Sequence, residues 1–298
     1  MVELKVAGAP ISWGVCEVPG WGELLPPSRV LSEMASLGLT ACELGPTDYL
    51  PADPVALACI LAQHGLRAVA GFVPLVLHDP RHADAALAQA AEFADRFAAA
   101  GAELLVSAAV ADAAWSPRRP LDAVGWRHLL EMLPRLDKLT ERRGLRHVLH
   151  PHAGTLIEDA ADVDRVLAES EVDICLDTGH LSIGGVDPVE LVERASGRVG
   201  HVHLKDVDLA VAARVRAGEL GLQEAVRAGM FQPLGEGDVA IADVIERLVA
   251  HGYDGWYVLE QDIAIPAGEV PGAGEGPLAA VRQSIHHLQS LAAAAVGT

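Results

Sequence analysis

The stretch from Ile174 to Val207 carries the side chains best suited to metal-dependent chemistry. It reads ICLDTGH, then a Pro-marked segment with helical spacing, and then GHVHLKDV. Polar side chains, most of them able to bind a metal, occupy or follow its two apolar runs: Asp177, His180, His201, His203, Lys205 and Asp206. Mixed imidazole and carboxylate ligands suit a divalent transition metal such as Mn, Co, Fe or Zn. This stretch therefore predicts a metal site.

The same pattern continues on either side of this stretch. Upstream, HVLHPHAGT ends an apolar run with His150 and His152, and downstream GWYVLEQD ends another with Glu260 and Asp262. An unpaired carboxylate at the end of an apolar strand is costly, which favours Glu260 as a metal ligand. Four strand-like segments with such side chains at their carboxyl ends are typical of the catalytic rim of a parallel α/β barrel. We therefore expect these groups to converge on one divalent ion.

Several of these residues also have a purely structural interpretation. A single histidine on a strand is more often a core residue than a ligand, but recurrence on successive strands favours a site. Asp177 either faces the barrel mouth or caps a following helix, whose start the sequence places later, near Pro188. Lys205 either reaches a substrate oxygen or pairs with Asp206 at the surface. Glu43, which ends a strand in CELGPTDYLP, either binds substrate hydroxyls or forms an ion pair.

Strand-like runs alternate with helical periodicity along the whole chain, which predicts βα units around a parallel sheet. The expected strands are Lys5–Ile11, Ala41–Leu44, Arg67–Val73, Leu104–Ser107, His147–His150, Ile174–Asp177, Val199–Leu204 and Trp256–Glu260. The expected helices are Ser28–Leu37, Pro54–His64, Ala83–Ala100, Trp126–Arg143, Asp159–Glu169, Pro188–Ala195, Ala242–His251 and Leu278–Ala294. This order predicts a single α/β domain over residues 1–298, a (β/α)8 TIM barrel. We expect the long connection 206–238, after strand seven, to form a wall or lid over the site.

Composition and charge narrow the classes of function. The chain has 298 residues, 51% of them hydrophobic, and a formal charge of −19 from 41 acidic and 22 basic residues. That balance opposes the phosphate contacts of nucleic-acid binding and favours a small neutral substrate. The four cysteines lack CxxC spacing, the N-terminus does not read as a signal peptide, and the Ala-rich runs are too polar to span a membrane. We therefore expect reduced core cysteines and a cytoplasmic protein without nucleic-acid or membrane partners.

With these residues in place, nearly the whole chain resembles the xylose isomerase-like, sugar phosphate isomerase/epimerase superfamily of metal-dependent barrels. Within it, the chain resembles the inosose (2-keto-myo-inositol) dehydratases of inositol catabolism. The segments that carry this resemblance are APISWG, SEMASLGLTACELGP, HPHAGT, DTGHLSIGG, HVHLKDV and the long KDVDLAVAARVRAGELGLQEAVRAGMFQPLGEGDVAI.

The resemblance implies metal ligands at the ends of strands five to eight. Asp177, His203 and Glu260 match the last three positions, and His150 stands where isomerases and epimerases normally carry Glu. That departure resembles the HxH strand of the dehydratases. A second departure follows Glu260, where dehydratases tend to read EAEQD and this chain reads LEQDIAIPAGEVPG. The implied cofactor is one divalent ion, Mn or Co, with Fe, Zn and Mg as alternatives.

The resulting hypothesis is a lyase that dehydrates a keto-cyclitol, a small neutral polyhydroxy ketone, through a metal-stabilised enediolate. The residues expected to transfer protons are His152, His180 and Lys205. Those expected to contact substrate are Trp13, Glu43, His201 and Asp206.

The alternative for the same site is an isomerase or epimerase of a ketose or inosose, which ranks second because the strand-five Glu is missing. An endonuclease and a non-catalytic barrel rank lower, and the oligomeric state, a homo-oligomer included, stays open.

Overall fold

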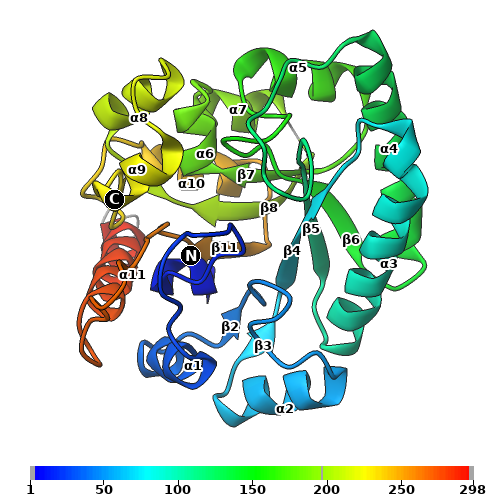
Figure 1. Ribbon diagram of the computed structural model, residues 1–298. Coiled ribbons are helices and arrows are strands. Elements are labelled where there is room, and N and C mark those ends of the chain that lie inside the picture. Colours follow the sequence, from blue (N-terminus) through cyan, green and yellow to red (C-terminus); the bar gives the residue numbers. More distant parts are fainter. Residues whose placement is uncertain (1–3, 196, 295–298) are drawn as a thin grey trace.

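Parallel strands surrounded by helices form a barrel in the computed structural model of this chain (Figure 1), which describes residues 4–195 and 197–294. The strands of the sheet are β1 Lys5–Gly8, β2 Ala41–Cys42, β3 Arg67–Ala68, β4 Ala70–Leu75, β5 Leu104–Ala109, β6 Arg146–Leu149, β7 Ile174–Asp177, β8 Val199–Leu204 and β11 Trp256–Leu259. Their order is β3-β2-β1-β11-β8-β7-β6-β5-β4, with every pairing parallel.

The two edge strands of this sheet are consecutive in the chain, and this closes the barrel. Only Val69 separates β3 from β4. Its N–H donates to the Cys42 carbonyl at 3.0 Å, and its carbonyl accepts from the Leu104 N–H at 3.2 Å. The two short strands therefore act as one strand between β2 and β5, and the predicted (β/α)8 barrel is confirmed.

The helices that cover the barrel begin and end where the sequence carries the matching signals. They are α1 Pro27–Ser36, α2 Pro54–Gln63, α3 Ala83–Ala99, α4 Ala123–Glu141, α5 Ala160–Glu169, α7 Pro188–Arg194, α10 Ile241–Ala250 and α11 Pro277–Ala294. Proline occupies the first turn of α1, α2 and α7, where its missing N–H costs no helical hydrogen bond. The Asp159 side chain caps α5 in a reciprocal capping box with Asp162.

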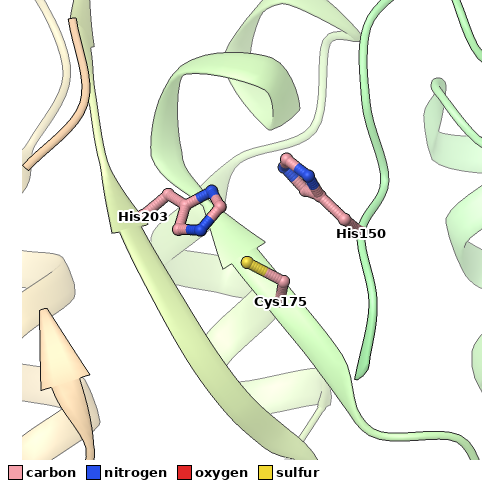
Figure 2. Close-up of side chains that lie close together, drawn as sticks. All are labelled: His150, Cys175 and His203. Atoms are coloured by element: carbon pink, nitrogen blue, oxygen red, sulfur yellow. The ribbon is translucent and has the colours of Figure 1, made fainter. Parts of the chain in front are cut away.

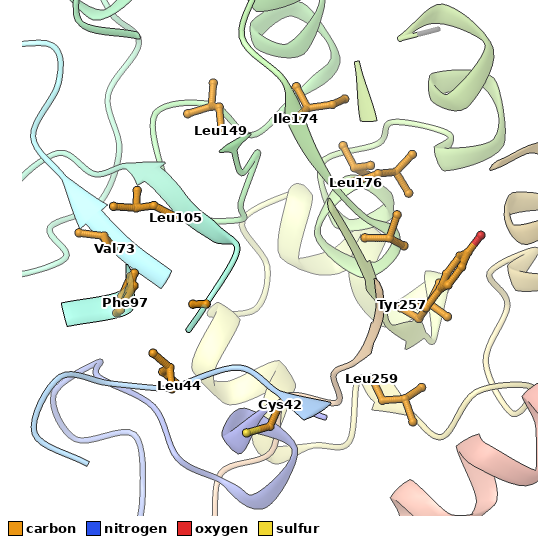
Figure 3. Close-up of a cluster of buried hydrophobic side chains, with 14 of the residues drawn as sticks. Cys42, Leu44, Val73, Phe97, Leu105, Leu149, Ile174, Leu176, Tyr257 and Leu259 are labelled. Carbon is orange, nitrogen blue, oxygen red and sulfur yellow. The ribbon is translucent and has the colours of Figure 1, made fainter. Parts of the chain in front are cut away.

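Hydrophobic side chains form two layers around the strands. The outer layer lies between strands and helices and includes Leu105, Leu176 and Tyr257 (Figure 3). The inner layer fills the barrel with mostly small side chains, among them Ala7, Ala70, Val106, Val148, Cys175 and Val258. Because successive residues of a strand point to opposite faces, each strand contributes to both layers. This packing fixes the strands whose carboxyl ends carry the polar residues.

The connection 206–238 contains regular elements rather than one long loop. They are β9 Asp206–Val207, α8 Leu209–Arg216, α9 Leu222–Arg227 and β10 Phe231–Gln232, and β9 pairs with β10 in antiparallel register. The Gln223 amide donates to the Gly20 carbonyl at 2.7 Å, and the Arg227 guanidinium donates to the same oxygen at 3.0 Å. The segment is therefore held against the loop that follows β1.

Within residues 4–195 and 197–294, none of the helices combines the length and the apolar character needed to cross a bilayer. All four cysteines are free thiols. Cys42 and Cys175 are buried and Cys16 is half-buried, as expected of core cysteines, but Cys59 is exposed. The expectation of a core position is wrong for Cys59, because it lies on the outer face of α2.

Gly71 supplies a test of the outer layer, because the ring of Phe97 lies directly over it. A Cβ atom at position 71 would overlap that ring, and Phe97 is buried. We expect Gly71→Ala to lower the free energy of unfolding by about 1–3 kcal/mol, the usual cost of overpacking a core. Urea denaturation measures the effect. The double variant Gly71→Ala/Phe97→Leu should recover part of the loss, and a wild-type midpoint for Gly71→Ala would contradict this packing.

Candidate active site

The carboxyl ends of five strands bring nine polar side chains together at one end of the barrel. They are Glu43 after β2, His150 and His152 after β6, Asp177 at the end of β7, His201, His203 and Lys205 in and after β8, and Glu260 and Asp262 after β11. Eight of them are buried and His152 is half-buried. A cavity of about 390 Å³ opens above them, which is in the usual range for a small-molecule site.

Four of these side chains point electron-donating atoms at one another. His203 Nδ1 lies 3.3 Å from Asp177 Oδ2 and 3.2 Å from Glu260 Oε2, and His150 Nε2 lies 3.4 Å from Asp177 Oδ2. Among the described residues, His150 Nε2, Asp177 Oδ2 and His203 Nδ1 have no hydrogen-bond partner although they are buried. Buried polar atoms normally have one. A divalent cation between them would satisfy all of these atoms, so the residues fit a metal ion.

Cys175 lies beneath the two histidines, and Figure 2 shows its thiol directed towards the space between the rings of His150 and His203. The three donor atoms lie within 4.8 Å of one another. Burial raises the pKa of the Cys175 thiol to about 11, and a protonated thiol is a poor ligand. Burial also lowers the pKa of His150 to about 4, which keeps its imidazole neutral, as ligation requires.

Asp177 combines the two interpretations that the sequence left open. Its Oδ1 accepts the His180 N–H at 2.8 Å and caps a short helix, α6 Thr178–Ile183. Its Oδ2 faces His203 and His150 instead. The expectation that no helix begins before Pro188 is therefore wrong, because α6 starts immediately after the strand. One carboxylate therefore both orients this turn and presents an oxygen to the two imidazoles.

Lys205 is buried among carboxylates. Its Nζ donates to Asp262 Oδ1 at 2.7 Å and to His180 Nε2 at 2.9 Å, and it lies 3.0 Å from Glu260 Oε2. Burial alone would lower the pKa of Lys205, but the charges of Asp177, Asp262 and Glu260 raise it well above its usual value. Burial raises the pKa of Asp262 to about 6. The alternative of a surface lysine paired with Asp206 is therefore wrong.

His152 and His180 stack on each other, with ring centroids 3.6 Å apart. Burial lowers the pKa of both imidazoles well below the usual value, so both are neutral near pH 7. His152 lines the cavity, and its Nδ1 is 2.8 Å from the Ala153 carbonyl. A carbonyl oxygen only accepts, so Nδ1 carries the proton and Nε2 is free to accept another. His180 lies behind His152 and Lys205 instead of lining the cavity.

Glu43 links the cavity to the two histidines of β8. Its Oε1 lies 2.7 Å from His201 Nε2 and 2.9 Å from His203 Nε2. Burial alone would raise the pKa of Glu43, but the two imidazoles hold it well below its usual range. Glu43 is therefore an ionised carboxylate deep in the barrel. Of the two alternatives, pairing within the protein describes this arrangement, with His201 and His203 as the hydrogen-bonding partners of Glu43.

Comparison with known proteins identifies the family of this barrel. The family described as "Xylose isomerase-like TIM barrel" matches residues 31–291. The chain belongs to this family. It is 32% identical to the inosose dehydratase of Geobacillus kaustophilus over 88% of this chain and 89% of that one. It is 31% identical to the rhizopine catabolism protein MocC of Rhizobium meliloti, covering 88% of this chain and 82% of that one. The crystal structure of IolI protein with a bound zinc atom superposes with a TM-score of 0.72 at 12% identity, covering 97% and 98% of the chains.

Three of the four residues expected to contact substrate do not line the cavity of this xylose isomerase-like barrel: Trp13, His201 and Asp206. Trp13 is buried outside the cavity, and its indole N–H donates to Glu33 Oε2 at 2.8 Å. The Asp206 carboxylate accepts four backbone N–H groups at 2.8 to 3.1 Å, from Val207, Gly235, Gly237 and Val239. Its oxygens hold the end of the connection 206–238 and do not face the cavity. Trp13 and Asp206 therefore have structural roles, because their polar side-chain atoms already have partners within the protein.

Aromatic residues on one side of the cavity escaped the sequence analysis. Phe72 of β4 stacks on Trp115, with ring centroids 6.3 Å apart, and both line the cavity. Trp115 has φ 57, a left-handed conformation that is costly for a residue with a Cβ. Asp112 holds this turn by accepting the N–H groups of Ala114 and Ser116. The only sequence signal was a loop of Asp, Ser and Pro residues, which does not reveal where its tryptophan points.

The donor set leads to a prediction about metal content. We expect Asp177→Asn and Glu260→Gln each to lose most of the bound divalent ion, because each removes a charged ligand from a buried site. Elemental analysis after dialysis against metal-free buffer measures the effect, with circular dichroism to show that each variant is folded. Full metal occupancy in both folded variants would refute this ligand set.

Proposed function

We propose that this protein is a metal-dependent hydro-lyase that removes water from a keto-cyclitol such as 2-keto-myo-inositol (scyllo-inosose), in inositol catabolism. The observation that carries the proposal is that one cavity brings together a metal-donor set, a lysine held as a cation and a neutral histidine. These are the groups that elimination of water beside a ketone requires. The names of the curated relatives, among them inosose dehydratases, support this choice of reaction.

The residues that would hold the metal are His150, Asp177, His203 and Glu260. When bound, a divalent cation polarises the ketone oxygen and stabilises the negative charge that develops on it. Two imidazoles and two carboxylates favour Mn or Co over Mg, which prefers oxygen ligands. Fe and Zn are the alternatives for the same donors. The zinc bound in the IolI structure, which has the same fold, supports a transition metal as the ion.

The protein's own residues would carry the protons. His152 lines the cavity, and its Nε2 carries the lone pair because Nδ1 holds the proton, so Nε2 takes the proton from the carbon next to the ketone. The electron pair of that C–H bond forms the new C=C bond as the β-hydroxyl departs. The Lys205 ammonium donates a proton to this hydroxyl, which leaves as water. His180 acts through its contact with Lys205 Nζ and its stacking on His152, so it positions both groups without touching the substrate.

The charge of the cavity favours an uncharged substrate. Among the residues that the structure describes, Lys205 is the only lysine or arginine that lines the cavity, and its ammonium is held by Asp262 and Glu260. Nothing in that lining offers a free cation to a carboxylate or a phosphate. Phe72 and Trp115 supply an apolar wall, against which the C–H face of a cyclitol ring can pack. These features support a small neutral polyhydroxy ketone.

A cytoplasmic location and the absence of nucleic-acid partners belong to the same proposal. Free thiols such as Cys42, Cys59 and Cys175 suit a reducing compartment. The formal charge of −19 and the carboxylates around the cavity oppose binding of a polyanion.

The reaction is tested with 2-keto-myo-inositol that carries deuterium on the carbon next to the ketone. We expect the Mn- or Co-loaded protein to release both the label and one water, giving an ultraviolet-absorbing dione or enone. Mass spectrometry and absorbance follow the two changes. Label exchange without loss of mass would instead indicate the isomerase or epimerase alternative. An acidic analogue, with a carboxylate on the ring, should be turned over more slowly, because beyond the metal site the described lining of the cavity offers it no free cation.

A second prediction concerns His180. We expect His180→Asn to lower turnover by about a hundredfold or more, the usual scale for disturbing general acid–base catalysis. Metal content should remain at the wild-type level, because His180 lies outside the proposed ligand set. The matched control is His286→Asn, an exposed histidine of α11. Wild-type turnover in His180→Asn would remove this residue from the mechanism, and loss of metal would place it among the ligands.

A further inference from the structure

Glu43 and His201 entered the sequence analysis as substrate contacts, but their geometry assigns them another task. We propose that Glu43, backed by His201, is a positioning residue that fixes the ring orientation and the protonated nitrogen of His203. It thereby presents His203 Nδ1 to the metal. The inference rests on the metal site of the proposed function, but it does not depend on which substrate that site takes.

The first support is the contact that Glu43 makes across the barrel. Glu43 follows β2, and His201 and His203 lie on β8, which is separated from β2 in the sheet by β1 and β11. One oxygen, Oε1, nevertheless lies within 2.9 Å of Nε2 of both histidines. The exposed fractions of Glu43, His201 and His203 are 4%, 0% and 2%. These bonds are therefore shielded from water and geometrically constrained.

The second support is the choice of nitrogen that this contact imposes. An ionised carboxylate only accepts hydrogen bonds, so the Nε2 atom of His203 must carry the proton. In a neutral imidazole the lone pair then lies on Nδ1. That atom is the one that faces Asp177 Oδ2 and Glu260 Oε2, at 3.3 and 3.2 Å. Orientation of a ligating histidine by a carboxylate on its other nitrogen is a general feature of metal sites.

The third support is the cost of burying His201. It is fully buried and does not line the cavity. Its Nδ1 has no hydrogen-bond partner within the described part of the chain, so Glu43 is its one polar contact there. A buried carboxylate with a histidine partner is seldom worth more to stability than apolar residues of the same size. The Glu43–His201 pair is better explained by its effect on His203, the proposed metal ligand. His201 keeps the Glu43 carboxylate ionised and directed at His203.

The experiment measures metal affinity in the absence of substrate. Glu43→Leu removes the acceptor, and we expect the Kd for Co²⁺ to rise by about 10- to 100-fold, the usual effect of losing such a partner. Glu43→Gln keeps an acceptor oxygen without the charge and should recover part of the affinity. The control is Glu17→Gln, a glutamate that lines the same cavity and should leave the Kd unchanged. Titration of the metal-free proteins, followed by the visible absorption of Co²⁺, gives each Kd.

Kinetics separate positioning from substrate binding. With Co²⁺ at saturation, we expect kcat to fall in Glu43→Gln while KM for 2-keto-myo-inositol stays near the wild-type value. A wild-type Kd for Co²⁺ in Glu43→Gln would overturn the proposal, and a raised KM in the same variant would return Glu43 to substrate binding. If Glu43→Leu does not fold, Glu43→Gln alone decides, since an unchanged Kd in that variant is sufficient to refute it. Because the titration uses no substrate, a failure here is distinct from a failure to dehydrate.

Discussion

Buried negative charge at the carboxyl end of the barrel is the constraint on which the rest of the site depends. Asp177, Glu260 and Asp262 lie together with almost no access to water, and carboxylates in such surroundings need a cation. Lys205 supplies one from the protein itself, within 3.5 Å of all three. One lysine cannot neutralise three carboxylates. The remaining charge, together with the unpartnered atoms of His150 and His203, accounts for the affinity that we propose for a divalent ion.

This charge cluster requires a close approach between two adjacent βα connections. Gly179, in the turn after β7, is packed so tightly that a Cβ atom there would lie 2.6 Å from Lys205 Cβ. The Thr178 hydroxyl donates to the Lys205 carbonyl at 2.6 Å and accepts its N–H at 2.8 Å. The DTGH sequence therefore does more than place the Asp177 carboxylate at the end of β7. Its glycine leaves room for the lysine stem, and its threonine fixes the backbone that carries it.

The sequence predicted the features that depend on the periodicity of hydrophobic residues. It did not predict those that depend on the direction in which a single side chain points. The eight strands and the residues at their ends follow from local patterns, so the barrel and the convergence of Asp177, His203 and Glu260 on one rim were expected. Trp13 and Asp206 were misplaced because proximity in the sequence to a catalytic segment does not reveal where a side chain points. Trp115 was missed for the same reason.

The short helix α6 shows a different limit of sequence patterns. Its residues Thr178–Ile183 form little more than one turn, too short to produce a helical period, and Asp177 served as both cap and ligand candidate. The two roles are told apart by the positions of the two carboxylate oxygens of Asp177. One accepts a backbone N–H, and the other faces the imidazoles of His150 and His203. Local sequence carries no such information, because it depends on how β6, β7 and β8 are placed around the barrel.

The alternation of side chains along β8 places three of these groups at successive depths below the mouth of the barrel. His201, His203 and Lys205 are two residues apart, so their side chains share the inward face of the barrel. Each meets a different environment. His201 lies against Glu43, His203 lies between Glu43 and the carboxylates of Asp177 and Glu260, and Lys205 reaches the cavity. A single strand and the residue that follows it therefore carry the partner of Glu43, the proposed metal ligand and the proposed proton donor. A shift of β8 by one residue would turn all three outward, so the pairing of β8 with β7 and β11 determines the chemistry of the site.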